Sequence, residues 1–220
     1  MSSALPVILA LVGGGIFVVL IVAWARKQSE RAHANVQRLA GQLGLTMAPV
    51  TTYLGFKSEP RASGLFRGKP AELFTYTTGS GKSRVRWSAL ALTPHDTGGF
   101  TFTLSRQGFG HTVSELFGAR EITVGDPAFD ASWFIQTNQP EFMQAALIPE
   151  LRARVTAALE RTGRSGSFKL EKERVIYAEM GDFSDVERCD RLARVAEPLS
   201  DLADAAEVFA ESKSGRSPRA

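Results

Sequence analysis

The strongest hydrophobic pattern of the chain lies at its beginning. Residues 4–25 carry no charged side chain and are almost entirely apolar. A helix rises about 1.5 Å per residue, so this run is long enough for the hydrocarbon core of a bilayer, which is about 30 Å thick. The run has no polar face, and Trp24 stands at its end, where an interfacial aromatic residue is expected. The pattern predicts a transmembrane anchor over residues 1–25.

A cleaved signal peptide is the alternative for this segment. Ala23, Trp24 and Ala25 resemble a small-x-small cleavage site. The uncharged start and the length of the apolar run favour an anchor that stays in place. Basic residues follow the run and none precedes it. Because positive charge is retained inside, we expect a single-pass protein whose C-terminal domain is cytoplasmic.

Residues 26–44 continue with a helical pattern. The apolar positions recur at helical spacing, and Gly44 is a plausible helix end. These positions are Ala32, Val36, Leu39, Ala40 and Leu43. We expect a juxtamembrane helix that packs on its own domain, and a short coiled coil is the alternative.

The pattern then changes to period two, which is typical of half-buried strands. In the clearest example, Phe100, Phe102 and Leu104 alternate with polar residues. Short connections between the runs predict antiparallel neighbours. The runs are 62–67, 72–77, 84–92, 100–105, 121–124 and 133–137.

Helical patterns dominate the last third of the chain. One covers 140–161 and is interrupted near Pro149, and a strand hairpin follows at 167–180. A second helix is predicted over 184–211, with Ser184 and Glu187 as a capping box. Pro198 is expected to kink or split this helix.

These elements predict an α+β fold. An N-terminal transmembrane helix precedes one domain over residues 45–211, in which six to eight antiparallel strands are covered by helices. A pleckstrin-homology-like arrangement is the nearest specific expectation. Residues 212–220 are predicted to be a disordered basic tail because of their composition.

Charge is distributed unevenly along the chain. The net charge of the 220 residues is +3. Residues 26–44 and the tail after Glu211 each carry +3, so the body between them carries −3. A negatively charged body argues against nonspecific binding to nucleic acid.

The body itself has a basic segment, residues 57–86, with seven basic and two acidic side chains. It lies just after the predicted anchor, which suggests contact with an anionic inner leaflet. The alternative is a solvated strand face that pairs with the acidic later half. The candidate binding residues are Arg67, Lys69, Lys82, Arg84 and Arg86.

Candidate catalytic groups are few. Asp126 and Asp130 could act as a carboxylate pair, but the favoured interpretation is that Asp126 caps an Asp-Pro turn while Phe129 enters the core. Segment 78–83 resembles the end of a phosphate-binding loop, but Tyr76 stands where the first glycine is needed and a strand pattern follows. We interpret it as a hairpin turn.

No metal site or cofactor is expected. The three histidines lie far apart in the sequence, without carboxylates or thiolates at ligand spacing. The single cysteine, Cys189, cannot form an internal disulfide and falls on the apolar stripe of the last helix.

A short motif carries a family resemblance. With Gly125-Asp126-x-x-Phe129-Asp130-x-x-Phe134, followed by Leu151-Arg152, the chain resembles membrane-anchored bacterial proteins of unknown function. The resemblance implies a bacterial inner-membrane location and no particular chemistry.

Two function classes follow from the sequence. The first is a membrane-tethered binding or scaffolding domain that recognises a protein or anionic lipid. The second is a membrane-associated hydrolase that uses Asp126 and Asp130. The binding domain is favoured, because the sequence contains no nucleophile–base pair and no metal cluster at recognisable spacing.

Overall fold

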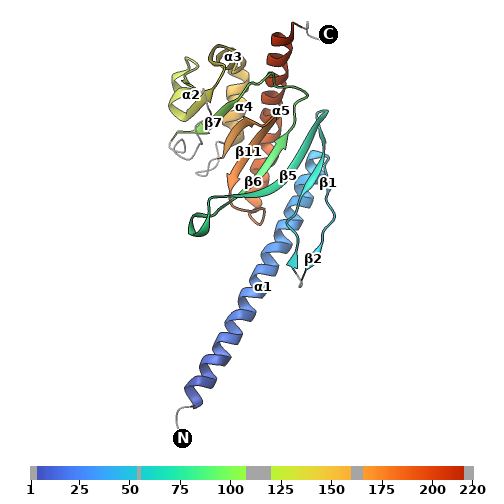
Figure 1. The fold of residues 1–220 in the computed structure, drawn as a ribbon, viewed down its shortest axis with the longest axis vertical. Coiled ribbons are helices and arrows are strands. Elements are labelled where there is room, and N and C mark those ends of the chain that lie inside the picture. Colours follow the sequence, from blue (N-terminus) through green and yellow to red (C-terminus); the bar gives the residue numbers. More distant parts are fainter. Residues whose placement is uncertain (1–3, 54–55, 108–119, 160–165, 216–220) are drawn as a thin grey trace.

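The protein is an α+β fold built on one nine-stranded antiparallel sheet (Figure 1). The computed structural model describes the chain except for residues 1–3, 54–55, 108–119, 160–165 and 216–220, and except for the side chains of residues 4–12 and 56. The strand order is β1-β4-β5-β6-β11-β10-β7-β9-β8. A separate two-stranded hairpin, β2–β3, lies next to helix α1.

The elements have the following bounds. The strands of the main sheet are β1 (Thr46–Met47), β4 (Ala62–Phe66), β5 (Lys69–Thr78), β6 (Val85–Leu92), β7 (Phe102–Arg106), β8 (Arg120–Ile122), β9 (Trp133–Thr137), β10 (Ser167–Glu171) and β11 (Arg174–Met180). The small hairpin is β2 (Thr52–Tyr53) and β3 (Phe56–Lys57). The helices are α1 (Ala4–Leu43), the 3-10 turn η1 (Gly81–Ser83), α2 (Pro127–Ser132), α3 (Pro140–Ala146), α4 (Pro149–Leu159) and α5 (Val186–Ser214).

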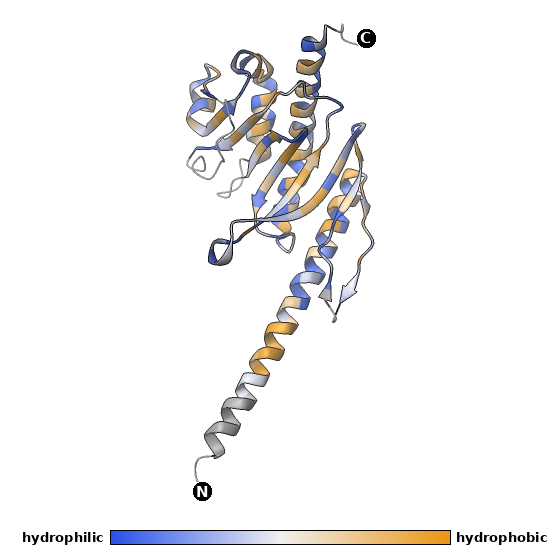
Figure 2. Cartoon of the chain, in the orientation of Figure 1, coloured by the Kyte–Doolittle hydropathy of each residue, from blue (hydrophilic) through white to orange (hydrophobic). Residues whose placement is uncertain are grey.

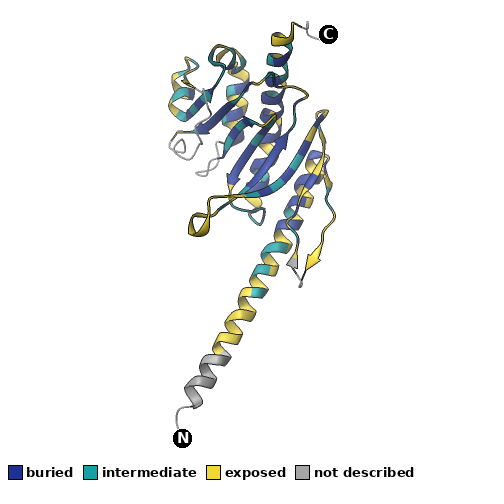
Figure 3. Ribbon diagram, viewed as in Figure 1, coloured by how far each residue is buried: buried dark blue, intermediate teal, exposed yellow. Residues whose placement is uncertain are grey.

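The core lies between the sheet and the helices α1, α4 and α5 (Figure 3). Side chains alternate between the two faces of each strand, so every second residue faces the helices. Six apolar residues on this face, one from each of six neighbouring strands, lie directly opposite one another and form a row across the sheet. All members of the row are at most 1% exposed. The row consists of Leu73, Leu90, Tyr177, Phe168, Leu104 and Ile135.

Helix α1 is one continuous helix, and its C-terminal part belongs to the core. The predicted apolar stripe from Ala32 to Leu43 is buried in the core of the domain. The expectation that this helix packs on its own domain is therefore confirmed. A coiled coil is not needed to cover it.

The predicted transmembrane anchor is wrong. Across the part of the chain that the structure describes, no helix holds a long enough apolar stretch to cross a membrane. Where the side chains of α1 are described, the uncharged stretch runs only from Gly13 to Ala25 before Arg26 and Lys27 interrupt it (Figure 2). The expected single-pass location in a bacterial inner membrane, with a cytoplasmic domain, rested on that anchor and loses its basis.

Three further expectations need correction. Within the described part of the chain, the sheet has nine strands rather than six to eight, and its order runs from β1 to β8 without closing, so the pleckstrin-homology-like arrangement is also wrong. Pro198 does not split the last helix, which continues as α5 to Ser214, into the predicted tail. The N-cap of α5 is Asp185 rather than Ser184, since the Asp185 side chain accepts hydrogen bonds from the amides of Glu187 and Arg188.

A buried charged network joins α5 to the centre of the sheet. Glu179 of β11 and Arg191 of α5 have side chains that are 3% and 2% exposed. The Arg191 guanidinium donates to both carboxylate oxygens of Glu179 over 2.7–2.9 Å, and the Tyr177 hydroxyl donates to Oε1 over 2.6 Å. Burial alone would lower the pKa of Arg191, but its hydrogen bonds to Glu179 raise it. These hydrogen bonds fix α5 against β11.

We predict that Arg191→Met lowers the free energy of unfolding by about 3–5 kcal/mol, because it leaves the Glu179 carboxylate buried without its partner. The triple variant Tyr177→Phe, Glu179→Leu and Arg191→Met removes both charges of the pair and the hydroxyl that bonds to it. It should recover part of that loss, although Arg188, 3.9 Å from Glu179, also loses a carboxylate. Urea unfolding of the three proteins measures both changes. Equal losses in the single and triple variants would contradict this role of the pair.

Candidate functional site

The two candidate catalytic carboxylates hold a loop. Asp126 is the N-cap of α2, and its Oδ1 accepts hydrogen bonds from the amides of Ala128 and Phe129 over 3.1 and 3.2 Å. The carboxylate of Asp130 accepts the amides of Val124 and Gly125 over 2.9 and 3.1 Å. These bonds close the connection between β8 and β9. The geometry gives both residues a structural task.

The five candidate binding residues do not form one basic patch. Arg67 forms ion pairs with Glu197 and Asp201, and Lys69 forms ion pairs with Asp204 and Glu207, all on α5. Burial by itself lowers the pKa of Lys69, but its hydrogen bonds to the two acids raise it. These two residues fasten the β4–β5 hairpin to α5.

The other three candidates lie elsewhere. Lys82 belongs to η1 and Arg84 follows it, in the exposed connection between β5 and β6. This connection contains segment 78–83, which is a hairpin turn between antiparallel strands, as predicted. Arg86 leaves the turn and forms an ion pair with Glu59. The structure therefore places the five candidate residues in two separate regions, one beside α5 and one at the β5–β6 turn.

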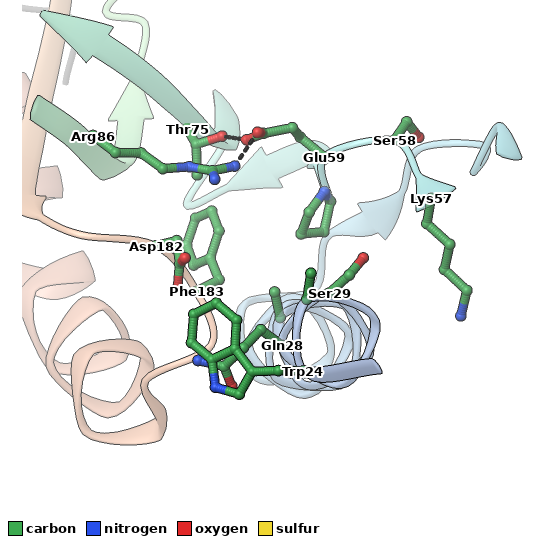
Figure 4. Close-up of a pocket in the computed structure, with 13 residues that line it drawn as sticks. Trp24, Gln28, Ser29, Lys57, Ser58, Glu59, Thr75, Arg86, Asp182 and Phe183 are labelled. Atoms are coloured by element: carbon green, nitrogen blue, oxygen red, sulfur yellow. Dashed lines mark hydrogen bonds and ion pairs between the residues drawn. The ribbon is translucent and has the colours of Figure 1, made fainter. Parts of the chain in front are cut away.

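Arg86 and Glu59 instead lead to a groove that the sequence does not reveal. The groove has a volume of about 290 Å³ and lies between α1, the sheet and the turn before α5 (Figure 4). We call it the α1 groove. Its polar and aromatic lining residues are Trp24, Gln28 and Ser29 of α1, Lys57, Ser58 and Glu59 before β4, Thr75 and Arg86 of the sheet, and Asp182 and Phe183 of the turn.

One side of the groove is a fixed polar array. The Glu59 carboxylate pairs with the Arg86 guanidinium through Oε1 and accepts a hydrogen bond from the Thr75 hydroxyl through Oε2 (Figure 4). Thr75 is 9% exposed. The array is held in place before any ligand arrives.

Asp182 adds a second carboxylate to the groove. The amide and hydroxyl of Ser184 both donate to its Oδ1, over 2.9 and 2.5 Å. Partial burial by itself would raise the pKa of Asp182, but the bonds from Ser184 and the charges of Arg86 and Arg188 lower it overall. Asp182 is therefore a charged acceptor at neutral pH.

Arg188 stabilises the turn that carries Asp182. Its guanidinium donates to the carbonyl of Asp182 and lies 3.4 Å from the Asp185 carboxylate. Gly181 makes this approach possible. It has a φ of +115°, and a Cβ there would lie 2.4 Å from Nη2 of Arg188. Arg188 also lies 3.9 Å from Glu179, so the groove wall is continuous with the buried network.

The groove escaped sequence analysis because its residues come from five separate segments of the chain. Trp24 was interpreted as an interfacial anchor residue, and Glu59 only reduced the charge of a basic segment. The one local signal is the cluster of Asp182, Ser184 and Asp185, which indicates a capped helix start and says nothing of a ligand. Across the described residues, no group of three histidine, cysteine, aspartate or glutamate side chains is placed to hold a metal ion.

Comparison with known proteins gives a likeness in fold alone. No family model and no curated protein matches the sequence. A solved structure, the mycobacterial trehalose monomycolate transport factor A, TtfA, is similar with a TM-score of 0.50 and 9% identity. The match covers 80% of this chain and 96% of that chain. The resemblance carried by the Gly125–Phe134 motif stays a prediction.

We predict that Gly181→Ala destabilises the protein by more than the roughly 1–3 kcal/mol of backbone strain alone, because the new methyl group also displaces Arg188. Gly99→Ala is the matched control. Gly99 also has a positive φ, +79°, but a Cβ there meets nothing within 4 Å. Thermal and urea unfolding compare the two variants. Equal losses would show that Arg188 yields without cost.

The lowered pKa of Asp182 predicts a pH dependence. Its contribution to stability is fully present above the usual carboxyl pKa of 3.8 and is lost as the pH falls through the lower pKa of the folded state. Asp182→Asn should therefore lose less stability on acidification than the unaltered chain. Urea unfolding at a series of pH values between about 6 and 2 measures the slope. Parallel curves for the two proteins would contradict the assignment.

Proposed function

We propose that this protein is a non-catalytic binding domain that docks a partner protein through the N-terminal half of α1. The observation that carries the proposal is a run of six large apolar side chains at residues 16–21, each between 48% and 67% exposed. We call this run the apolar collar. It lies where α1 projects from the domain, as the orange band in Figure 2 shows.

The exposed collar is costly in water. Burying a single large aliphatic or aromatic side chain stabilises by about 1.5–3 kcal/mol. Monomeric proteins rarely leave a contiguous apolar patch of this kind uncovered, and such patches mark interaction sites. The collar therefore supports a docking role for α1.

The shape of the collar favours a particular kind of partner. Its six residues are consecutive, and successive residues of a helix point about 100° apart, so the apolar surface surrounds the helix. One flat face cannot cover such a surface. A partner that offers a groove between apolar helices can enclose it.

A binding role also agrees with the rest of the molecule. The carboxylates on which the hydrolase hypothesis rested, Asp126 and Asp130, accept backbone amides of their own loop. The structure that shares this fold is named a transport factor.

The experiment is photo-crosslinking of the full chain in its native cells. We predict that a photoreactive amino acid in place of Leu20 yields a discrete protein adduct, and that the same residue in place of the exposed Lys82 does not. Val19→Gln and Ile21→Gln together should lower the adduct at least about tenfold, because 1.4 kcal/mol corresponds to a factor of ten and two buried side chains contribute more than that.

The same variant needs a stability control. Residues 19 and 21 lie outside the buried core, so the thermal midpoint of the domain should not change. Adducts with lipid alone, no adduct at all, or equal yields from positions 20 and 82 would each overturn the proposal.

A further inference from the structure

We propose that the α1 groove binds a neutral, polyhydroxylated ring, such as a hexose or a cyclitol. This site is independent of the apolar collar. The proposal rests on the charge balance of the groove, on its ordered donors and acceptors, and on the apolar ring surfaces beside them.

The charges that line the groove cancel. Lys57 and Arg86 contribute two positive charges, and Glu59 and Asp182 contribute two negative charges. An anionic ligand such as a phosphate would face both carboxylates. A cationic ligand would face Arg86, whose charge also lowers the pKa of Asp182. A ligand without net charge meets neither penalty.

The polar groups still have hydrogen-bonding capacity. Glu59 uses one lone pair of each oxygen for Arg86 and Thr75, and each oxygen has a second. The guanidinium of Arg86 has five N–H donors, of which the ion pair with Glu59 uses those of one nitrogen. Asp182 takes both Ser184 bonds on Oδ1, so Oδ2 can accept a ligand hydroxyl. Gln28, across the groove, adds an amide that can still donate two hydrogen bonds, while its Oε1 accepts one from Arg31 over 3.3 Å (Figure 4).

Ring surfaces complete the site. Trp24 is 66% exposed and lines the groove together with the buried Phe183. In Figure 4, Trp24, Gln28 and Ser29 lie on one side, and Glu59, Thr75 and Arg86 lie on the other. A sugar ring has C–H groups on its faces and hydroxyls around its edge. It can therefore pack a face on the indole while its hydroxyls reach the polar array.

The size of the groove agrees with this ligand. Its volume of about 290 Å³ is at the lower end of small-molecule sites, which hold roughly 300–1,000 Å³. The two carboxylates disfavour a purely apolar molecule, which would leave them without hydrogen-bond partners. One or two rings with hydroxyl groups satisfy size and chemistry together.

The test is calorimetric titration of the full chain with neutral methyl glycosides and with myo-inositol. Glucose 6-phosphate, a sugar of similar size that carries negative charge, is titrated for comparison. We expect at least one neutral ring to bind with a Kd in the millimolar range or tighter, and more tightly than the phosphate. Trp24→Ala and Glu59→Gln should each weaken that binding at least tenfold. Glu173→Gln, on the exposed β10–β11 turn, is the control and should not change it.

The outcomes are distinct. Stronger binding of the phosphate would make the groove an anion site and would overturn the proposal. Absence of binding by every neutral probe to the unaltered chain would also overturn it, and so would equal affinity in the Trp24→Ala variant. Glu59→Gln keeps the size of the side chain. If this variant binds the neutral ring more weakly while its thermal midpoint is unaltered, Glu59 contacts the ligand directly. None of these results depends on the collar.

Discussion

The ion pair between Glu179 and Arg191 is the interaction on which the structure depends. It joins the C-terminal helix α5 to a strand in the middle of the sheet, and both partners are removed from water. A buried pair of this kind contributes little net stability compared with apolar residues, but it tolerates only one arrangement of its partners. It therefore fixes the position of α5 along β11. The position of α5 in turn places Arg188 against the turn at Gly181. This turn forms one wall of the groove.

A second set of charges explains the uneven distribution in the sequence. The basic residues of the β4–β5 hairpin form ion pairs with the acidic residues of α5. Asp201 of α5 forms a further ion pair with Arg154 of α4. Positive charge early in the body and negative charge late in it are thus the two sides of an internal contact. Arg67 and Lys69 are committed to the fold rather than offered to a partner. Charge segregation along a sequence is no measure of charge segregation on a surface.

The strands of the sheet were predictable where apolar and polar residues alternate along the sequence. The alternation of Phe102 and Leu104 with polar residues locates β7, although Thr103 and Ser105 are buried too, so this strand is covered on both faces. In the hairpin at 167–180, β10 does show burial at every second position. The anchor prediction failed because an uncharged apolar run has the same composition whether it crosses a bilayer or projects from a domain. The groove was beyond prediction for a different reason. Trp24, Glu59 and Asp182 are brought together by the antiparallel pairing of distant strands and by the packing of α1 on α5, which no local pattern encodes.

The place of β11 in the sheet has a consequence for how the chain folds. Strands β4, β5 and β6 pair with one another in sequence order, and β9 pairs with both β7 and β8. Among the described strands, these two groups are not adjacent in the sheet. Only the β10–β11 hairpin joins them, with β11 on β6 and β10 on β7. A chain emerging from the ribosome therefore holds two half-sheets with open edges until its last quarter is made. Unpaired edges of this kind invite wrong pairing. The buried Arg191–Glu179 contact forms only when the hairpin and α5 are both present, and it locks the inserted strand in place at the end of synthesis.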